Sequence, residues 1–259
     1  MKISMLLENT AKNDCFCAEH GLSMFIETEK LNILFDTGAG PLFVENAKQL
    51  GIDLADVDVA IISHGHNDHG GGLATFLALN DKAKVYVTPQ AFDRYFNDSN
   101  KEISINAGLL STGRFALVED VMKLGEGVEL LTCNKLVNPY PVKAYGLKRV
   151  KNGQMLEDDF KHEQYLVIEE QGKRIVFSGC SHKGIMNISQ WLKPDILIGG
   201  FHFMKIEDEA ELQAAADVLN KFDTEYYTCH CTGVKQYEYL EKVMPRLHYL
   251  HCGDVLELK

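Results

Sequence analysis

The sequence lacks the long apolar run that a membrane-spanning helix needs, because no stretch approaches roughly 20 consecutive apolar residues. A secretory leader is not evident either, since residues 1–9 form only a short apolar stretch that quickly becomes polar. The seven cysteines are an odd number, which argues against a complete disulfide framework. We therefore expect a protein of the reducing cytoplasm that does not associate with a membrane.

An excess of basic residues is also missing. The chain has 26 Lys and Arg against 37 Asp and Glu, for a formal net charge of −11, and no basic stripe is evident along it. Because nucleic-acid-binding proteins usually present such a stripe, we expect no nucleic-acid partner. The acidic balance does not exclude an anionic small-molecule substrate, because bound dications dominate the field around them. The sequence leaves the oligomeric state open.

Apolar runs and amphipathic segments alternate along the chain, and no low-complexity linker interrupts them. Strands are expected at 2–8, 22–28, 31–36, 57–62, 84–88, 165–170, 174–178, 195–198 and 225–229, with a closing hairpin around Gly253. Helices are expected at 41–50, 184–192, 208–222 and 234–243. Segments 97–114 and 134–159 have no clear period and are expected to cover the functional site. This alternation predicts an α/β fold with helix-covered sheets, in a single domain over residues 1–259.

One segment carries most of the chemical information. Residues 63–72 read Ser-His-Gly-His-Asn-Asp-His-Gly-Gly-Gly and directly follow the apolar run 57–62. Packing three imidazoles and a carboxylate together at the end of a strand is unfavourable without a cation. Neutral imidazole and carboxylate groups are ligands that suit zinc, iron and manganese. The segment therefore predicts a metal site formed by His64, His66, Asp68 and His69.

The spacing of these four residues allows two ions. His64 and His66 are two positions apart and can converge on one point, whereas Asp68 and His69 lie on the following turn and can face a second. Two-metal sites typically hold their ions roughly 3.5–4 Å apart around a bridging water whose pKa is lowered towards neutrality. We expect two divalent metal ions, with zinc as the default and manganese or iron also compatible.

The His-x-His-x-Asp-His spacing, with a strand before it and a glycine-led helix after it, resembles the signature of the metallo-β-lactamase superfamily. The segments 19–23, 179–185, 199–202 and 230–233 resemble more closely a subfamily often labelled 7,8-dihydropterin-6-methyl-4-(β-D-ribofuranosyl)-aminobenzene-5′-phosphate synthase, or metal-dependent hydrolase. The resemblance covers nearly the whole chain. It implies an αββα sandwich of two mixed β-sheets covered by helices, with the site at one sheet edge. The synthase activity is not carried over, because nothing in these residues identifies a pterin pocket.

The resemblance also implies the remaining ligands. His162, shortly before the run 165–170, matches the third-motif histidine, and His230 matches the last motif. Cys180 takes a position where the superfamily commonly has a bridging aspartate, with His182 as its competitor, so that one of the two is expected to bind metal. Asp36 matches the first motif, where it orients ligand histidines.

The implied reaction is hydrolysis of a small-molecule ester by a metal-bound hydroxide, with a phosphoester as first choice. Asp68 is expected to bind the second metal and steer the nucleophile, and His202 or His182 to protonate the leaving group. Two alternatives stay open, namely a mononuclear iron oxygenase acting on a persulfide and a metal-binding regulatory protein with little turnover. Candidate anion contacts are Arg114, Lys148 and Arg149.

Overall fold

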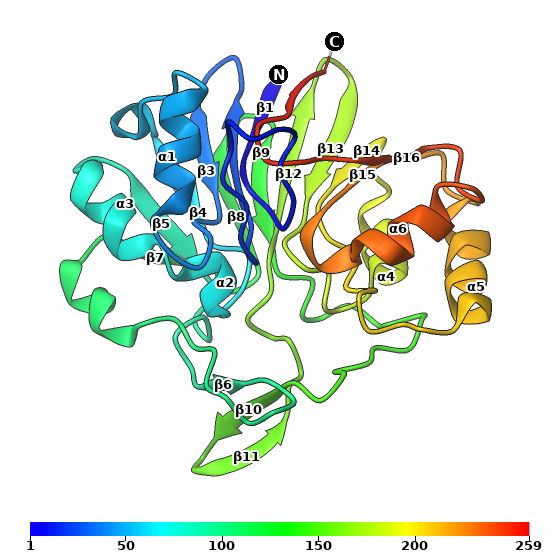
Figure 1. Ribbon diagram of the computed structural model, residues 1–259. Helices are drawn as coiled ribbons and strands as arrows, with labels where there is room; N and C mark the ends of the chain where they lie inside the picture. The colour runs from blue at the N-terminus through cyan, green and yellow to red at the C-terminus, as the bar shows by residue number, and fades with distance from the viewer. Residues whose placement is uncertain (259) are drawn as a thin grey trace.

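The computed structural model describes residues 1–258 and has four layers, with helices on the outside and two sheets in the middle (Figure 1). Both central layers are mixed seven-stranded sheets. The outer face of the first sheet packs against α1 (Leu42–Gln49) and α3 (Leu73–Leu79). The outer face of the second packs against α4 (Ile185–Leu192), α5 (Glu209–Leu219) and α6 (Val234–Leu240). This arrangement confirms the predicted αββα sandwich.

The two sheets repeat one topology. The first has the order β17-β1-β2-β3-β4-β5-β7 and the second β16-β15-β14-β13-β12-β9-β8. In the first, pairing is antiparallel from β17 to β3 and parallel from β3 to β7. In the second, it is antiparallel from β8 to β13 and parallel from β13 to β16. Each half of the chain therefore places several strand carboxyl ends at one edge of its sheet.

The strands of the first sheet are β1 (Lys2–Leu7), β2 (Ser23–Glu27), β3 (Asn32–Phe35), β4 (Val59–Ile61), β5 (Lys84–Val87), β7 (Phe115–Leu117) and β17 (Val255–Glu257). Those of the second are β8 (Val121–Gly125), β9 (Val128–Leu131), β12 (Tyr165–Glu170), β13 (Lys173–Phe177), β14 (Ile196–Ile198), β15 (Glu225–Thr228) and β16 (Leu247–Tyr249). Short 3₁₀ segments lie at Leu54–Asp56, Ala107–Thr112 and His230–Thr232.

Burial on both faces explains why the central strands read as continuous apolar runs. In β2, Met24 and Ile26 belong to the core between the sheets, whereas Phe25 lies in the core under α1. Successive strand side chains point to opposite faces, so a strand covered on both sides needs apolar residues at every position. The same pattern recurs in β13, where Ile175 and Phe177 face the other sheet and Val176 faces the helices.

Two regions differ from the prediction. The segment around Gly253 is not a hairpin, because β16 pairs with β15 of the second sheet while β17 pairs with β1 of the first. The segment 134–159 contains the unpredicted hairpin of β10 (Lys148–Lys151) and β11 (Gln154–Glu157), which with β6 (Tyr95–Phe96) forms a small third sheet that projects from the sandwich (Figure 1). All four residues of β11 are exposed, so no hydrophobic alternation marks this strand in the sequence.

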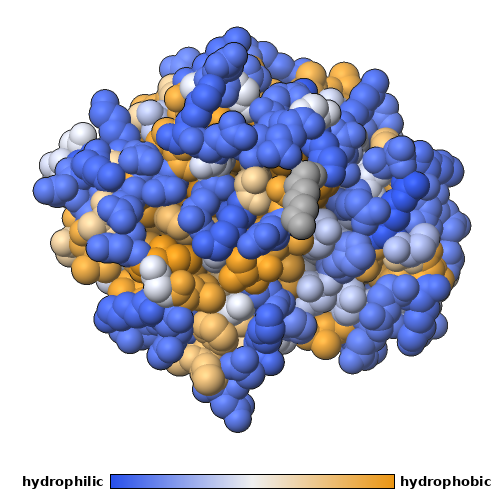
Figure 2. Space-filling model, turned by 90° about the horizontal axis from the view of Figure 1, so that it is seen from above, coloured by the Kyte–Doolittle hydropathy of each residue, from blue (hydrophilic) through white to orange (hydrophobic). Residues whose placement is uncertain are grey.

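The surface is mainly hydrophilic on the face that Figure 2 shows. Hydrophobic side chains show between the hydrophilic ones. Within residues 1–258, none of the helices combines the length and apolar character needed to cross a bilayer.

Candidate metal centre

The candidate site lies where loops from both sheets meet. Asp36 follows β3, and the histidine-rich segment with the short helix α2 (Asn67–Gly70) follows β4. The loops of Cys180, His202 and His230 follow β13, β14 and β15. Because each of these is a strand with a parallel neighbour, the fold brings their carboxyl ends to one edge of the sandwich.

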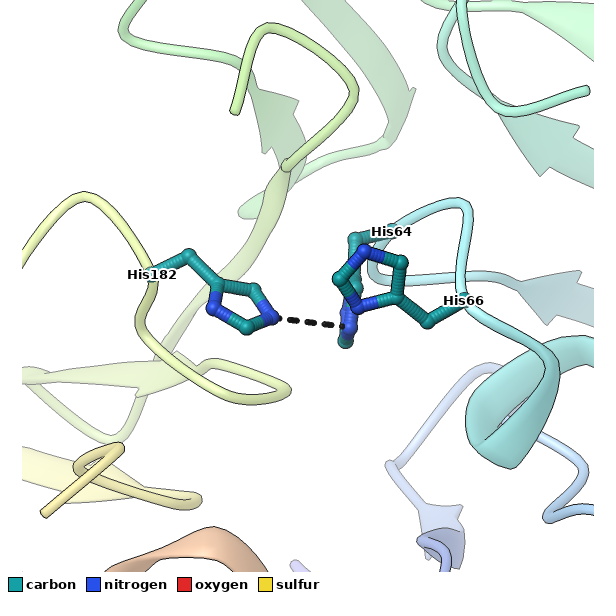
Figure 3. Close-up of side chains that lie close together, drawn as sticks. All are labelled: His64, His66 and His182. Carbon is teal, nitrogen blue, oxygen red and sulfur yellow. Dashed lines mark hydrogen bonds between the residues drawn. The ribbon is translucent and has the colours of Figure 1, made fainter. Parts of the chain in front are cut away.

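A first group of ligand atoms comes from His64, His66 and His182. Their candidate ligand atoms all lie within 4.8 Å of one another, and the Nε2 atoms of His64 and His182 are 3.2 Å apart (Figure 3). Two nitrogens bound to one tetrahedral zinc at about 2.0–2.1 Å would be roughly 3.3 Å apart, so this spacing is one that zinc ligation produces. The Nε2 of His66 is buried and has no hydrogen-bond partner within residues 1–258, as expected of an atom that a metal ion would satisfy.

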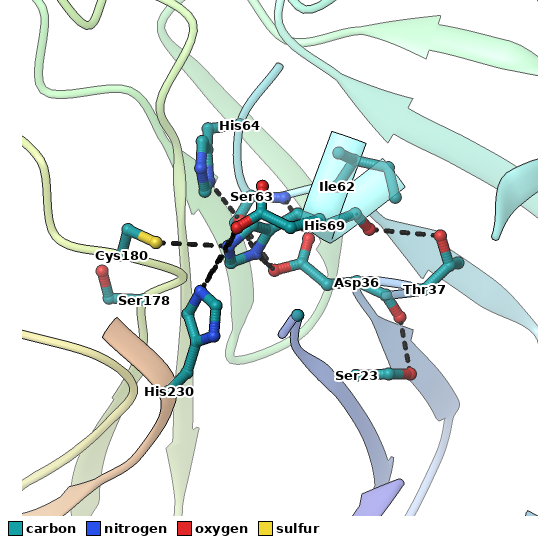
Figure 4. Close-up of polar contacts among 12 residues, drawn as sticks. Ser23, Asp36, Thr37, Ile62, Ser63, His64, His69, Ser178, Cys180 and His230 are labelled. Atoms are coloured by element: carbon teal, nitrogen blue, oxygen red, sulfur yellow. Dashed lines mark hydrogen bonds and ion pairs between the residues drawn. The ribbon is translucent and has the colours of Figure 1, made fainter. Parts of the chain in front are cut away.

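A second group lies beside the first. The Nε2 of His69 is 3.2 Å from both the Cys180 Sγ and the His230 Nε2 (Figure 4). The Asp68 Oδ2 is 3.5 Å from the His230 Nε2 and 3.7 Å from the His69 Nε2. Two imidazoles, a carboxylate and a thiol are a donor set that zinc accepts. Because His64, His69 and Cys180 also lie within one 4.8 Å cluster, the thiol is located between the two groups.

The charge state of the histidines suits a metal centre. Burial lowers the pKa of His66 to about 4 and also lowers the pKa values of His64 and His182, which keeps the three imidazoles in the neutral form that binds metal. Burial likewise acts to lower the pKa of His69, but the carboxylates of Asp36 and Asp68 outweigh it and raise this pKa to about 9. The second group is therefore a place where negative charge stabilises a cation.

Asp36 holds this arrangement from behind. Its carboxylate accepts hydrogen bonds from the Ser63 N–H, the Ser63 O–H and the His69 Nδ1, all at 2.7 Å. The Ser63 Oγ in turn lies 2.9 Å from the Nδ1 of His64. One buried carboxylate thus orients a histidine of each group, which is the contact that the sequence resemblance implied for Asp36.

Comparisons with known proteins agree with this geometry. The family model of the metallo-β-lactamase superfamily matches residues 18–144. The chain is 31% identical to the 7,8-dihydropterin-6-methyl-4-(β-D-ribofuranosyl)-aminobenzene-5′-phosphate synthase of Methanocaldococcus jannaschii, over 99% of this chain and 96% of that protein. It belongs to the metallo-β-lactamase superfamily. An uncharacterized protein of the same organism is 28% identical over 98% of this chain and 99% of its own length.

A solved structure gives the same result for the fold. A metal-dependent hydrolase of the β-lactamase superfamily superposes with a TM-score of 0.82 and 28% identity, covering 100% of this chain and 99% of the other. Membership of the superfamily implies divalent metal binding and an enzyme of the metal-dependent hydrolase type. The His, Cys and Asp clusters described above are the residues of this metallo-β-lactamase fold that fit such ions.

Both ring nitrogens of His162 have hydrogen-bond partners in the protein. Neither is therefore free to bind a metal ion, which differs from the role expected for this residue. Its Nδ1 accepts a hydrogen bond from the Gly65 N–H at 2.8 Å, and its Nε2 is 3.0 Å from the Asp158 Oδ2. Its ring also packs on Tyr95, with centroids 4.1 Å apart. His162 therefore holds the backbone between His64 and His66 in place.

Cys180 and His182 were expected to compete for one position, and the structure brings both to the centre, where their ligand atoms share a 4.8 Å cluster with His202. Cys180 contacts His69 of the second group, and His182 contacts His64 of the first. The third imidazole of the first group is thus supplied by His182, from the loop that follows β13. In the superfamily resemblance that position had been assigned to His162.

A buried carboxylate that the sequence did not single out, Glu163, holds the loop of His182. Its Oε1 accepts from the His182 N–H at 2.7 Å, and its Oε2 accepts from the Lys183 N–H at 3.0 Å and the Tyr165 O–H at 2.6 Å. The side chain is completely buried. Nothing in the local sequence distinguishes it from other glutamates, because the backbone groups that it holds are 19 and 20 positions away.

Substituting Glu163 tests this positioning role. We expect Glu163→Gln, which replaces one acceptor oxygen by an amide donor, to weaken metal binding about 10- to 100-fold, as outer-shell changes commonly do. Chelator competition on the purified protein measures the affinity. The matched control is Glu157→Gln, at an exposed position on β11, which should bind metal like the parent. An unchanged affinity in Glu163→Gln would contradict the role.

The candidate general acid His202 lies next to the first group. Its ring centroid is 4.3 Å from that of His182, and neither of its nitrogens has a hydrogen-bond partner within the described residues. Its backbone takes a φ of 57°, a left-handed conformation that is uncommon outside glycine. His20 lies beside the second group, with its Nε2 3.2 Å from the Asp68 Oδ2.

The candidate anion contacts are used elsewhere. Arg114 donates to the backbone carbonyls of Asn80 and Ala83, and Arg149 pairs with Asp159 at 2.8 Å. Lys148 donates to the Asn100 side chain at 2.7 Å. All three cations therefore have protein partners.

Proposed function

We propose that this chain is a dinuclear metal-dependent hydrolase of small-molecule esters, with phosphoesters as the preferred class. The observation that carries the proposal is the pair of adjacent ligand groups, His64, His66 and His182 on one side and Asp68, His69 and His230 on the other, with Cys180 between them. Zinc suits this mixture of imidazole, carboxylate and thiolate donors, and manganese or iron is compatible with the histidine-rich part. We further propose a cytoplasmic location and no nucleic-acid partner.

The chemistry divides between the ions and the chain. When bound, two divalent ions supply Lewis acidity and a water of lowered pKa. Asp36 and Ser63 hold His69 and His64 in the orientation that presents Nε2 to the centre. The buried loops exclude bulk water, which strengthens every electrostatic interaction inside. His202, beside the first group, donates a proton from a ring nitrogen to the leaving-group oxygen as the ester bond breaks.

Metal analysis together with a substrate panel tests the proposal. We expect the purified protein to contain two equivalents of a divalent metal and to hydrolyse phosphodiesters, phosphomonoesters or thioesters, with activity lost on chelation and restored by metal. One equivalent of iron with substrate-dependent oxygen uptake would point instead to the oxygenase chemistry. Two bound ions without hydrolysis across the panel would favour a regulatory protein.

His202 should matter most for poor leaving groups. We expect His202→Gln to lower kcat/KM about 10²- to 10⁴-fold for alkyl esters, whose leaving oxygen needs a proton, in the usual range for general acid catalysis. A p-nitrophenyl ester leaves as a stable anion and should be affected little. The dependence of kcat/KM on the leaving group, measured for the parent protein and for His202→Gln, checks this. Exposed His248 provides the control substitution, since its Nε2 contacts only Glu225, at 2.9 Å. An equal loss for all leaving groups would rule out proton donation by His202.

A further inference from the structure

A cavity of about 450 Å³ opens beside the metal ligand candidate His182. It lies between the start of α4, one face of α5, the loop that follows β14 and the segment 140–145. Its volume falls within the range of roughly 300–1,000 Å³ that is typical of small-molecule sites. The segment 134–159, expected from the sequence to cover the functional site, supplies one of its walls.

The charged side chains and the histidines that line this cavity lie in two places. Its walls are largely aliphatic and aromatic, with Met186, Phe203, Ile206, Ala215 and Val218 among them. His182 and His202 also line it, and they connect it to the ligand groups. Such walls stabilise apolar surface by removing it from water and offer nothing to a second charged group.

An ion pair marks the other polar place. Lys143 from the 140–145 segment and Glu211 from α5 both line the cavity and pair at 2.7 Å. Their side chains are 53% and 39% exposed, so the pair faces solvent. Because the two charges compensate each other, this part of the cavity is close to neutral and does not select for a highly charged ligand.

The unpartnered nitrogens of His202 tie the cavity to the chemistry. Both are buried and lack a hydrogen-bond partner among residues 1–258, although leaving a buried polar atom without a partner is unfavourable. The ring lies between His182 and Tyr145, at centroid distances of 4.3 and 5.5 Å. A ligand in the cavity would therefore meet a hydrogen-bonding group at the end that adjoins the ligand histidines and apolar walls elsewhere.

We infer that this cavity binds a bulky apolar or aromatic group of the substrate, attached next to the bond that is hydrolysed. The inference rests on the proposed hydrolase function. It assigns the substrate class as esters of aromatic or large apolar alcohols and excludes small, uniformly charged phosphates as preferred substrates. The hydrolysable bond lies at the His182 and His202 end, and the apolar group extends towards α5.

A matched pair of esters tests the substrate class. Methyl phenyl phosphate and methyl 2-naphthyl phosphate have leaving groups of similar acidity but different apolar area. At about 25 cal/mol for each Å² removed from water, the second ring should raise kcat/KM roughly five- to tenfold. The naphthyl preference should disappear in Ala214→Trp, because Ala214 lines the cavity from an exposed position on α5. Ala210→Trp is the control, since Ala210 is exposed on the same helix and is not part of the cavity lining.

A binding measurement separates this inference from the hydrolase proposal. Naphthalene fluorescence reports binding of 2-naphthylmethylphosphonate, whose P–C bond is not an ester, to the metal-loaded protein. Tight binding that is lost in Ala214→Trp and kept in Ala210→Trp supports the cavity assignment even if no ester is cleaved. Ester hydrolysis without a naphthyl preference, together with binding that Ala214→Trp leaves unchanged, would overturn the assignment and leave the hydrolase function standing. Equal metal content in all three proteins guards against an indirect effect.

Discussion

Replacing His66 with alanine is expected to reduce bound metal from two equivalents to about one and to lower kcat/KM at least about 10³-fold. His66 supplies one of three converging imidazoles, and its buried Nε2 forms no hydrogen bond within residues 1–258, with the Asp158 Oδ2 3.7 Å away. A metal ion acting as a Lewis acid stabilises a transition state by several kcal/mol, and a 10³-fold loss corresponds to about 4 kcal/mol. Asp68→Ala should do the same for the second ion. Elemental analysis of the purified variants and their steady-state kinetics give both numbers.

A substitution at an exposed histidine controls for nonspecific effects. His248→Ala removes an exposed side chain that contacts Glu225 and stacks on Tyr227, so its metal content and kinetics should match the parent. Unchanged metal content in both His66→Ala and Asp68→Ala would contradict the assignment of the two ligand groups. Loss of both ions in either variant would show that the groups bind cooperatively and would replace the two-site description by a single coupled centre.

The sandwich could be predicted because burial leaves a direct record in the sequence. Strands β3, β4, β13 and β14 are covered on both faces, so each is a short apolar run bounded by turn residues. Strands β8 and β11 leave no such record, because exposed positions alternate with partly buried ones in β8 and occupy all of β11. The closing segment was misjudged for another reason. The sequences of two strands joined by a turn look the same whether the strands pair with each other or belong to different sheets, as β16 and β17 do.

In the site, too, the ligands that are close together in the sequence could be predicted, whereas those set by contacts elsewhere in the chain could not. His64, His66, Asp68 and His69 could be predicted because their spacing alone brings them together. Whether His162 or His182 completes the first group depends on which loop directs its histidine to the centre. That choice is made by Asp158, which pairs with His162, and by Glu163, which accepts the backbone N–H of His182. Asp158 is only four positions from His162, whereas Glu163 acts on a backbone group 19 positions away, a contact that a single sequence does not reveal.

The cavity beside His182 was beyond sequence reasoning for a related reason. Its walls come from four separate segments, and each contributes residues that are ordinary core or surface residues in isolation. Ala214 reads as an exposed helix position, and Phe203 reads as one more apolar residue after β14. Only the docking of the segment 140–145 against α5, reinforced by the Lys143–Glu211 pair, turns them into a binding surface.

Cys180→Ala is expected to release the second ion and to lower kcat/KM at least about 10²-fold, which corresponds to about 2.7 kcal/mol. The Cys180 Sγ is 3.2 Å from the His69 Nε2 and buried with it, so it is located to bind as a thiolate. Cobalt(II) substitution gives a direct readout, because thiolate ligation produces a near-ultraviolet charge-transfer band that nitrogen and oxygen ligands do not. The band should be present in the parent protein and absent in Cys180→Ala.

A carboxylate in place of the thiol separates ligation from packing. Cys180→Asp should keep two ions and lose the cobalt–thiolate band, because aspartate binds metal through oxygen, whereas a thiol that only packs would give no band even in the parent. Cys133→Ala, at a buried cysteine in the core under α4 and α5, serves as the control and should keep both the band and the metal. The thiol of Cys231 also lies within 4.8 Å of the Cys180 and His230 ligand atoms. A band that survives Cys180→Ala and disappears in Cys231→Ala would therefore transfer the ligand role to Cys231.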